Sequence, residues 1–262
     1  VNDINIHKII RSSYLENILK GAMATGNWGT KVNASKQGVS QVLNRLTYPS
    51  SISHLRRVQT PADNTGKLIP PRKLHGTSWG YVCPTETPEG QAVGIVKNLS
   101  MNCEVSVTNT SETISFYIKK YIDEISEINI YKFNKQEFVK VLINGNWMGY
   151  TKNPNELIND FKQNRMNGNI NIFNSISWDT IGNLIQIHTD AGRPLRPLLI
   201  IEDSKVLFND SINQKIKNNN INWKHLISNI EKKGMCCIQY IDPYETNNCI
   251  ISMNINDIHK KS

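Results

Sequence analysis

The sequence predicts a multidomain α+β chain in which helices and short antiparallel sheets are mixed. With 262 residues, the chain is long enough for two or three modest cores. A hydrophobic content of 39% supplies enough apolar surface for folding. Helix-like and strand-like apolar spacings follow one another without a regular βαβ order, so a doubly wound nucleotide-binding fold is not expected.

The N-terminal region is predicted to be helical. Apolar residues recur every three or four positions over residues 3–24, and Gly26 marks the predicted end of this amphipathic helix. A second short helix is predicted over residues 39–46, with Pro49 as its stop. The sequence TPADNTGK, residues 60–67, combines Pro, Asp, Asn and Gly and therefore predicts an exposed tight turn.

Strand-like spacing follows over residues 76–107, where the Pro and Gly of TETPEG interrupt it. A helix is predicted over residues 112–125. A hairpin is predicted over residues 139–150, with an Asn-Gly pair at its turn. These patterns indicate a compact β region followed by a new domain that begins near residue 108.

In the last part of the chain, Asn153 is the predicted N-cap of a helix that starts at Pro154 and closes near Gly168. Strands are predicted over residues 183–189 and 198–201. Between them, the two prolines and the glycine of DAGRPLRP are expected to forbid regular structure. The remaining predicted elements are a helix over residues 223–234 and strands over residues 235–241 and 249–253.

The whole chain has a net formal charge of +8, and most of this positive charge lies in its first part. Residues 1–100 contain 12 Lys and Arg against 5 Asp and Glu, whereas residues 101–262 contain 18 against 17. Such clustering is typical of a phosphate-binding surface, although a solvated basic face without a ligand gives the same pattern. The densest cluster consists of Arg45, Arg56, Arg57, Lys67, Arg72 and Lys73, with Asp63 as its single acid.

Several catalytic and targeting patterns are missing from the sequence. It has no P-loop or dinucleotide-binding glycine motif, no serine elbow and no clustered aspartates. Its six histidines and five cysteines lack metal-ligand spacing. The N-terminus does not read as a secretion signal, and no apolar run approaches the roughly 20 residues of a membrane span. The residues alone therefore predict a basic, non-secreted binding chain without a complete active site.

Six segments, in order, carry a resemblance to a known family. Residues 43–100, LNRLTYPSSISHLRRVQTPADNTGKLIPPRKLHGTSWGYVCPTETPEGQAVGIVKNLS, closely resemble the fork region of the second-largest, β-type subunit of multisubunit DNA-dependent RNA polymerases. ATGNWG and GVSQVLNR resemble the first fork loop and the helix after it. The other resembling segments are VLINGNWMGYTKNP, TDAGRPLRPLLIIED and CIQYIDPYETNNCIISM. The resemblance is closer to the eukaryotic and large-DNA-virus branch than to the bacterial one.

The resemblance implies four parts of such a subunit. They are the end of the lobe and the first fork loop over residues 1–41, the fork (domain 3) over residues 42–107, the external 1 domain (domain 4) over residues 108–201 and the external 2 domain (domain 5) over residues 202–262. The chain is then expected to line the active cleft and to hold the DNA template, the RNA–DNA hybrid and the incoming ribonucleotide.

The basic cluster would contact phosphates in that setting, because guanidinium groups bind phosphate with two parallel hydrogen bonds. Arg56 and Arg57 match a pair of arginines in the family. Arg57 and Arg72 are the strongest candidates for a phosphate contact, and internal acids are the alternative partners of the cluster. The residues expected to lie near the nucleotide or the hybrid are Glu86, Glu89 and Gln91, with Glu89 orienting an arginine or screening the pore rather than binding a metal.

The loop over residues 60–67 departs from the family pattern. Cellular relatives commonly have TPIGRDGK at this position, so the arginine at the loop tip is replaced here. The loop is therefore expected to act as a steric wedge with a weaker electrostatic hold on DNA. The residues assigned to it are Thr60, Pro61, Asp63, Asn64 and Gly66.

The resemblance also implies cofactors, partners and a location. The activity of the assembled enzyme is nucleotidyl transfer supported by Mg²⁺, whose ligands belong to the largest subunit; zinc is expected only outside this chain. Expected partners are template DNA, nascent RNA, nucleoside triphosphates and the other polymerase subunits, without a membrane. The expected location is intracellular: the nucleus or, for a viral protein, host cytoplasm or virion. The alternative is a stand-alone nucleic-acid-binding protein derived from the fork fold, which the sequence following Ser262 would distinguish.

Overall fold

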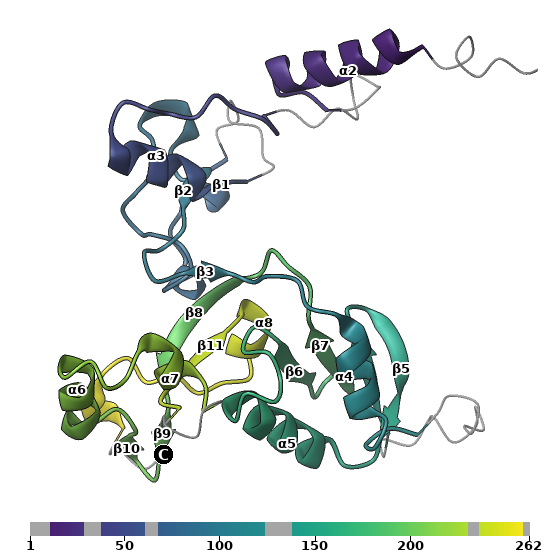
Figure 1. Cartoon of the computed structure of the whole chain (residues 1–262), viewed down its shortest axis with the longest axis vertical. Coiled ribbons are helices and arrows are strands. Elements are labelled where there is room, and N and C mark those ends of the chain that lie inside the picture. Colours follow the sequence, from purple (N-terminus) through teal and green to yellow (C-terminus); the bar gives the residue numbers. More distant parts are fainter. Residues whose placement is uncertain (1–10, 29–37, 61–67, 124–137, 230–235, 259–262) are drawn as a thin grey trace, which may run out of the picture. The chain divides into compact units, whose positions relative to one another are not determined.

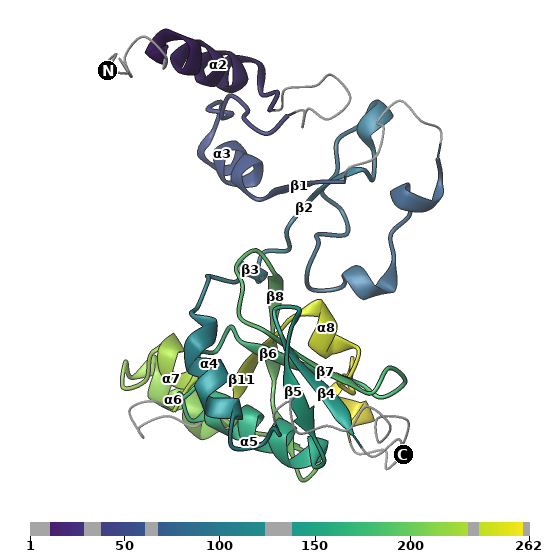
Figure 2. The same ribbon diagram turned by 90° about the vertical axis from the view of Figure 1, so that its right-hand side faces the viewer.

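A computed structural model of the protein describes residues 11–28, 38–60, 68–123, 138–229 and 236–258. The chain forms two compact units, Val1–Pro61 and Ala62–Ser262, which are treated separately below (Figures 1 and 2). Helices and several short sheets are present, which confirms the α+β class. Within the described ranges, no helix combines the length and the apolar character needed to cross a membrane.

The first unit begins with helix α2 (Ser12–Thr25). Gly26 ends the helix in the left-handed conformation, with φ of 72°, and its N–H donates to Ala22 O. The predicted end of the helix is therefore confirmed, and the glycine is the residue type that adopts this backbone without strain. The predicted start, over residues 3–10, lies outside the described residues. No side chain of α2 is buried.

The prediction of a short helix over residues 39–46 is wrong, because these residues form no helix. Helix α3 (Tyr48–Leu55) begins where that helix was expected to stop. Pro49 lies in the first turn of α3, where its missing N–H has no helical acceptor to lose. Thr47 and Ser50 form a capping box, in which each side chain accepts from the backbone N–H of the other. Strand β1 (Arg57–Gln59) follows the helix.

The second unit starts with irregular structure where strands were predicted. Between residues 68 and 107 only β2 (Val96–Asn98) and β3 (Glu104–Val105) are strands, and the rest is turns and single 3₁₀ turns. Three glycines in this stretch have φ between 71° and 84°, a conformation that breaks strand geometry. The 3₁₀ turns are Pro70–Arg72, Gly76–Ser78 and Gly90–Ala92.

A four-stranded sheet forms the centre of the second unit, in the order β5-β4-β7-β6. The hairpin of β4 (Val139–Ile143) and β5 (Asn146–Thr151) is confirmed, and its Asn144 and Gly145 both have positive φ. The strands β6 (Ser175–Asp179) and β7 (Leu184–His188) pair antiparallel. The pair β4 and β7 is parallel, contrary to the expected antiparallel sheets, because the chain crosses over between β5 and β6 through a helix.

Two helices cover this sheet (Figure 1). Helix α4 (Ser111–Ile118) contributes Ile114 and Ile118 to the core, and α5 (Pro154–Met166) contributes Leu157 and Phe161. Helix α5 lies close to its predicted position, whereas α4 ends at Ile118, seven residues before the predicted end at residue 125. Asn153 is the N-cap residue by position, although its side chain does not cap the helix backbone.

A three-stranded sheet, β11-β8-β3, shows that the expectation for DAGRPLRP was wrong. Strand β8 (Pro194–Leu199) contains both prolines and pairs with β11 (Ile238–Ile241). Pro194 is the first residue of β8, and β3 pairs only with Pro194 and Leu195, so Pro197 lies beyond the end of the β3 ladder. A strand tolerates proline at these positions because no neighbouring strand requires its N–H.

The C-terminal part is built from short elements. The helix predicted over residues 223–234 is present as the shorter α7. The prediction of a strand over residues 249–253 is wrong, because these residues form no strand. Sequence analysis did not predict α6. The elements are β9 (Ile201–Glu202), β10 (Lys205–Val206), α6 (Asp210–Lys217), α7 (Trp223–Ile227), α8 (Pro243–Thr246) and a 3₁₀ turn (Ile255–Asp257).

Candidate nucleic-acid interface

In the first unit, a web of polar contacts holds the loop that carries Arg45 against helix α3. His54 accepts a hydrogen bond from Asn44 N at 3.1 Å through Nδ1, and its Nε2 lies 2.9 Å from Gln41 Oε1. Ser51 Oγ donates to Asn44 O at 2.6 Å. The backbone on either side of Arg45 is therefore fixed to the helix that leads to Arg56 and Arg57.

The basic side chains of this unit differ in exposure. Arg45 and Arg57 are exposed, and Arg56 is half-buried. Thr60, at the start of the assigned fork loop, is also half-buried. The rest of that loop, Pro61, Asp63, Asn64 and Gly66, lies outside the described residues together with Lys67.

In the second unit, Arg72 binds the protein's own backbone. Its Nη1 donates to Gln91 O at 2.5 Å and to Val93 O at 2.9 Å, and its Nε donates to Leu68 O at 3.1 Å. The guanidinium therefore ties the turn around residue 70 to the loop that follows ETPEG. The neighbouring Lys73 is exposed.

The same loop is closed by two further features. Thr87 Oγ1 donates to Val96 O at 3.1 Å and accepts from Gly94 N at 2.8 Å. Gly94 has φ of 71°, and a Cβ on it would lie 2.3 Å from Arg72 O. Only glycine fits this position without moving the backbone.

The side chains that were predicted to lie near the nucleotide or the hybrid are on the surface of this loop. Glu86, Glu89 and Gln91 are exposed, and Glu89 precedes the 3₁₀ turn Gly90–Ala92. The structure brings Gln91 to Arg72 through the backbone carbonyl of Gln91. No described arginine forms an ion pair with Glu89, so the expected orienting role remains a prediction.

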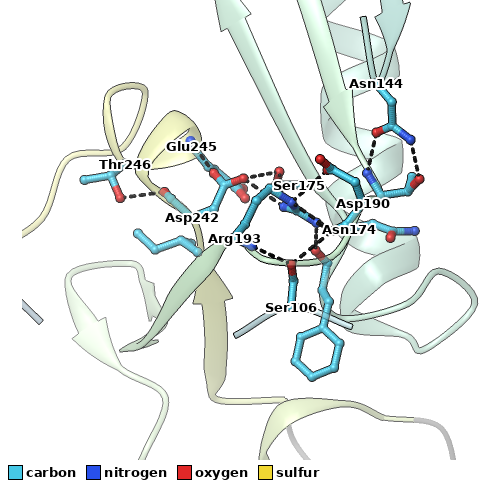
Figure 3. Close-up of polar contacts among 12 residues, drawn as sticks. Ser106, Asn144, Asn174, Ser175, Asp190, Arg193, Asp242, Glu245 and Thr246 are labelled. Atoms are coloured by element: carbon cyan, nitrogen blue, oxygen red, sulfur yellow. Dashed lines mark hydrogen bonds and ion pairs between the residues drawn. The ribbon is translucent and has the colours of Figure 1, made fainter. Parts of the chain in front are cut away.

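Sequence analysis did not identify a buried ionic network in the second unit. Arg193 Nη1 donates to Asp242 Oδ2 and to Ser175 Oγ, each at 2.9 Å (Figure 3). Its Nη2 donates to Phe173 O at 2.8 Å. Arg193 and Asp242 are both buried, so the network joins the start of β8 to β6 and to the N-terminus of α8.

A second buried pair lies beside the first. Arg165 of α5 binds Glu245 of α8 with two parallel hydrogen bonds, of 2.8 and 2.7 Å, and Arg165 Nη1 also donates to Asn174 O at 2.8 Å. The arginines and acids belong to segments quoted above for the resemblance, TDAGRPLRP and DPYET, and to α5. The sequence contains one sign of these pairs, namely charged residues next to apolar strand residues. This sign predicts a buried ion pair only when the two partners are known, so the pairs could not be identified from it.

No metal centre emerges from the described residues: among them, no three His, Cys, Asp or Glu side chains converge as ligands.

Comparison with known proteins gives two family-model matches. Residues 41–105 match RNA polymerase Rpb2, domain 3, and residues 141–202 match RNA polymerase Rpb2, domain 4.

Curated relatives match over almost the whole chain. The RNA polymerase II subunit RPB2 of Encephalitozoon cuniculi is 37% identical over 96% of this chain, and subunit 2 of RNA polymerase II from Arabidopsis thaliana is 36% identical over 98%. RNA polymerase subunit 2 of Acanthamoeba polyphaga mimivirus is 32% identical over 95%. The matched spans cover 22%, 21% and 20% of these relatives, so the chain corresponds to about a fifth of their length.

Proposed function

The chain belongs to the Rpb2 family of second-largest RNA polymerase subunits, and from this premise we propose that it lines the nucleic-acid cleft of a DNA-directed RNA polymerase. In that enzyme it helps to hold the DNA template, the RNA–DNA hybrid and the incoming ribonucleotide. The observation that carries the proposal is the match of nearly the whole chain to such subunits, in family order.

The distribution of charge supports this role. Arg45, Arg57 and Lys73 present exposed cations within the region that matches domain 3. Exposed Lys and Arg side chains bind phosphate groups without reading the base sequence, which suits a cleft that must accept any template. Arg56 and Lys67 are proposed to bind phosphate in the same way.

Arg72 takes a different part in the proposal. Because its guanidinium binds the carbonyls of Gln91 and Val93, it positions the loop that carries Glu86, Glu89 and Gln91. This loop would then contact the nucleotide or the start of the hybrid. The fork role is proposed for residues 42–107, with the loop over residues 60–67 as a steric wedge.

The proposed activity of the assembled enzyme is nucleotidyl transfer, in which Mg²⁺ stabilises the transferring phosphate. We propose that the largest subunit supplies the Mg²⁺ ligands. The residues of this chain bind and orient nucleic acid, and the partners are template DNA, nascent RNA, nucleoside triphosphates and the other subunits.

The test is the Arg57→Ala variant in the full-length subunit of the assembled polymerase. Loss of one phosphate contact should lower the salt concentration at which the elongation complex dissociates and reduce the salt slope of binding by about one. The measurement is the fraction of complex retained on a labelled hybrid as salt is increased. Lys205→Ala, which removes an exposed cation outside the cluster, is the matched control. An unchanged salt midpoint for Arg57→Ala would remove this residue from the phosphate contacts.

A further inference from the structure

A cavity of about 470 Å³ lies in the second unit, between residues 74–84 and strand β8. Apolar side chains dominate its lining, among them Leu74, Trp79 and Leu198. Leu74 and Trp79 are 65% and 60% exposed, so both present apolar surface at the cavity. The cavity is therefore suited to an apolar group from another molecule or segment.

The cavity also contains a buried positive charge. Arg196 lines it and is only 8% exposed. Its Nη1 donates to Trp79 O at 2.7 Å, and its guanidinium lies 5.2 Å from the centre of the Tyr81 ring. Nε has no hydrogen-bond partner, and no carboxylate of the described residues lies within 4.0 Å of the guanidinium.

The neighbouring arginines differ from Arg196 in this respect. Arg165 is paired with Glu245, and Arg193 is paired with Asp242. Among the described residues, three arginines and two acids are buried in this part of the fold, so Arg196 is left without a matching negative charge. A buried charge is costly unless an opposite charge or several hydrogen bonds compensate it.

Local backbone geometry is adapted to this arrangement. Gly80 has φ of 80°, and a Cβ on it would lie 2.8 Å from Arg196 Cδ. The absence of a side chain at residue 80 thus lets Arg196 lie directly against the turn that carries Trp79. The buried arginine is held in place from two sides, by this turn and by its own strand.

We propose that the cavity binds a peptide segment that carries a carboxylate next to an apolar side chain, with the carboxylate compensating Arg196 and the apolar side chain packing on Trp79 and Leu74. A peptide fits better than a nucleic acid. Among the described residues that line the cavity, Arg196 is the only one with a permanent charge, whereas a phosphate backbone is bound by several exposed cations. In the relatives, about four fifths of the length lies outside the matched span, so in those subunits other segments are available as occupants. The proposal does not depend on the nucleic-acid role of the basic cluster.

Two labelled peptide mixtures test the proposal with the 262-residue chain. Both are seven residues long, with flanking positions drawn from Leu, Phe, Met and Ala; the central residue is Glu in one mixture and Gln in the other. Fluorescence anisotropy should show binding of the Glu mixture about tenfold tighter than of the Gln mixture, as expected for a hydrogen bond to a charged group. Equal affinities, or no binding of either mixture, would overturn the proposal.

Variants at the rim distinguish this cavity from other surfaces. Leu74→Ala and Trp79→Ala change exposed side chains and should each weaken binding of the Glu mixture severalfold, whereas Leu15→Ala, an exposed leucine of α2, should not change it. A labelled six-nucleotide DNA provides the last arm. Displacement of the Glu mixture by this DNA would instead assign the cavity to nucleic acid and overturn the peptide proposal.

Discussion

At the scale of single residues, arginines in this chain have two kinds of environment. Arg45 and Arg57 are exposed, whereas Arg165 and Arg193 are buried and bound to acids. An exposed cation is available to a phosphate, and a buried one is engaged in holding elements together. Charge counts along the sequence could not separate the two groups, because pairing depends on partners that are 49 to 80 residues away.

The buried pair of Arg165 and Glu245 is predicted to contribute strongly to stability. Glu245→Gln keeps the size of the side chain but leaves the guanidinium of Arg165 without its negative partner, so the free energy of unfolding should fall by about 3–5 kcal/mol. Urea unfolding of the chain measures the change. Glu16→Gln is the control, because Glu16 and Lys20 form an exposed pair at a similar distance of 2.6 Å and should change stability by less than about 0.5 kcal/mol. Similar losses for both variants would contradict the role assigned to the buried pair.

Asp160 is predicted to make the stability of the second unit depend on acid pH. Hydrogen bonds donated by the hydroxyls of Tyr117 and Tyr121 hold the pKa of this carboxyl below its usual value. Because the folded-state pKa is lowered, this contribution is fully present above the unfolded pKa, near 3.8, and is lost as the pH falls through the folded pKa.

Asp160→Asn should therefore destabilise the protein by about 1 kcal/mol at neutral pH, and the difference from the unsubstituted chain should shrink as the pH decreases below 4. Chemical denaturation at pH values from 7 to 3 measures this convergence. A difference that stays constant over the whole range would show that ionisation of Asp160 is not involved.

At the scale of elements, the loop between Arg72 and Gly94 is predicted to tolerate very little change. Gly94→Ala would place a Cβ 2.3 Å from Arg72 O at a residue with φ of 71°, and should destabilise the chain by about 2 kcal/mol or more. Gly76→Ala is the matched control, since its Cβ would meet no atom within 4 Å. Thermal unfolding compares the two, and the Gly94 variant should also lose proteolytic protection of the ETPEG loop. Equal melting temperatures would refute the tight approach.

Elements with local causes could be predicted from the sequence, and elements with distant causes could not. The end of α2 at Gly26 and the hairpin turn at Asn144 depend on neighbouring residues, and both were predicted. Pro197 was taken as a strand breaker because the limited extent of β3 beside it could not be known. Pro49 was read as a stop, although a proline in the first turn of a helix is equally favourable.

The candidate site shows the same division. The basic cluster and the ETPEG loop could be identified from the sequence, whereas the binding of Arg72 to the carbonyls of Gln91 and Val93 could not, because a charged side chain gives no sign that its partners are backbone atoms. The burial of Arg196 in an apolar cavity could not be predicted for a related reason: the turn at Gly80 that lies against this side chain is more than a hundred residues earlier in the sequence.

At the scale of the whole molecule, the location of the positive charge has a measurable consequence for nucleic-acid binding. Residues 1–100 have 12 basic and 5 acidic side chains, whereas the rest of the chain is nearly balanced. If this region binds phosphates, neutralising its exposed cations should affect affinity more than neutralising the same number elsewhere.

Two triple variants with equal net charge separate these possibilities. In one, Arg45, Arg57 and Lys73 are replaced by Ala; in the other, the exposed Lys205, Lys215 and Lys217 are replaced by Ala. The first should reduce the slope of log affinity against log salt by about two to three for an RNA–DNA hybrid, and the second by less than about one, because only released counterions at contacted phosphates contribute to the slope. Binding isotherms at several salt concentrations measure both slopes. Equal reductions would mean that net charge, rather than an arranged surface in the region matching domain 3, attracts the nucleic acid.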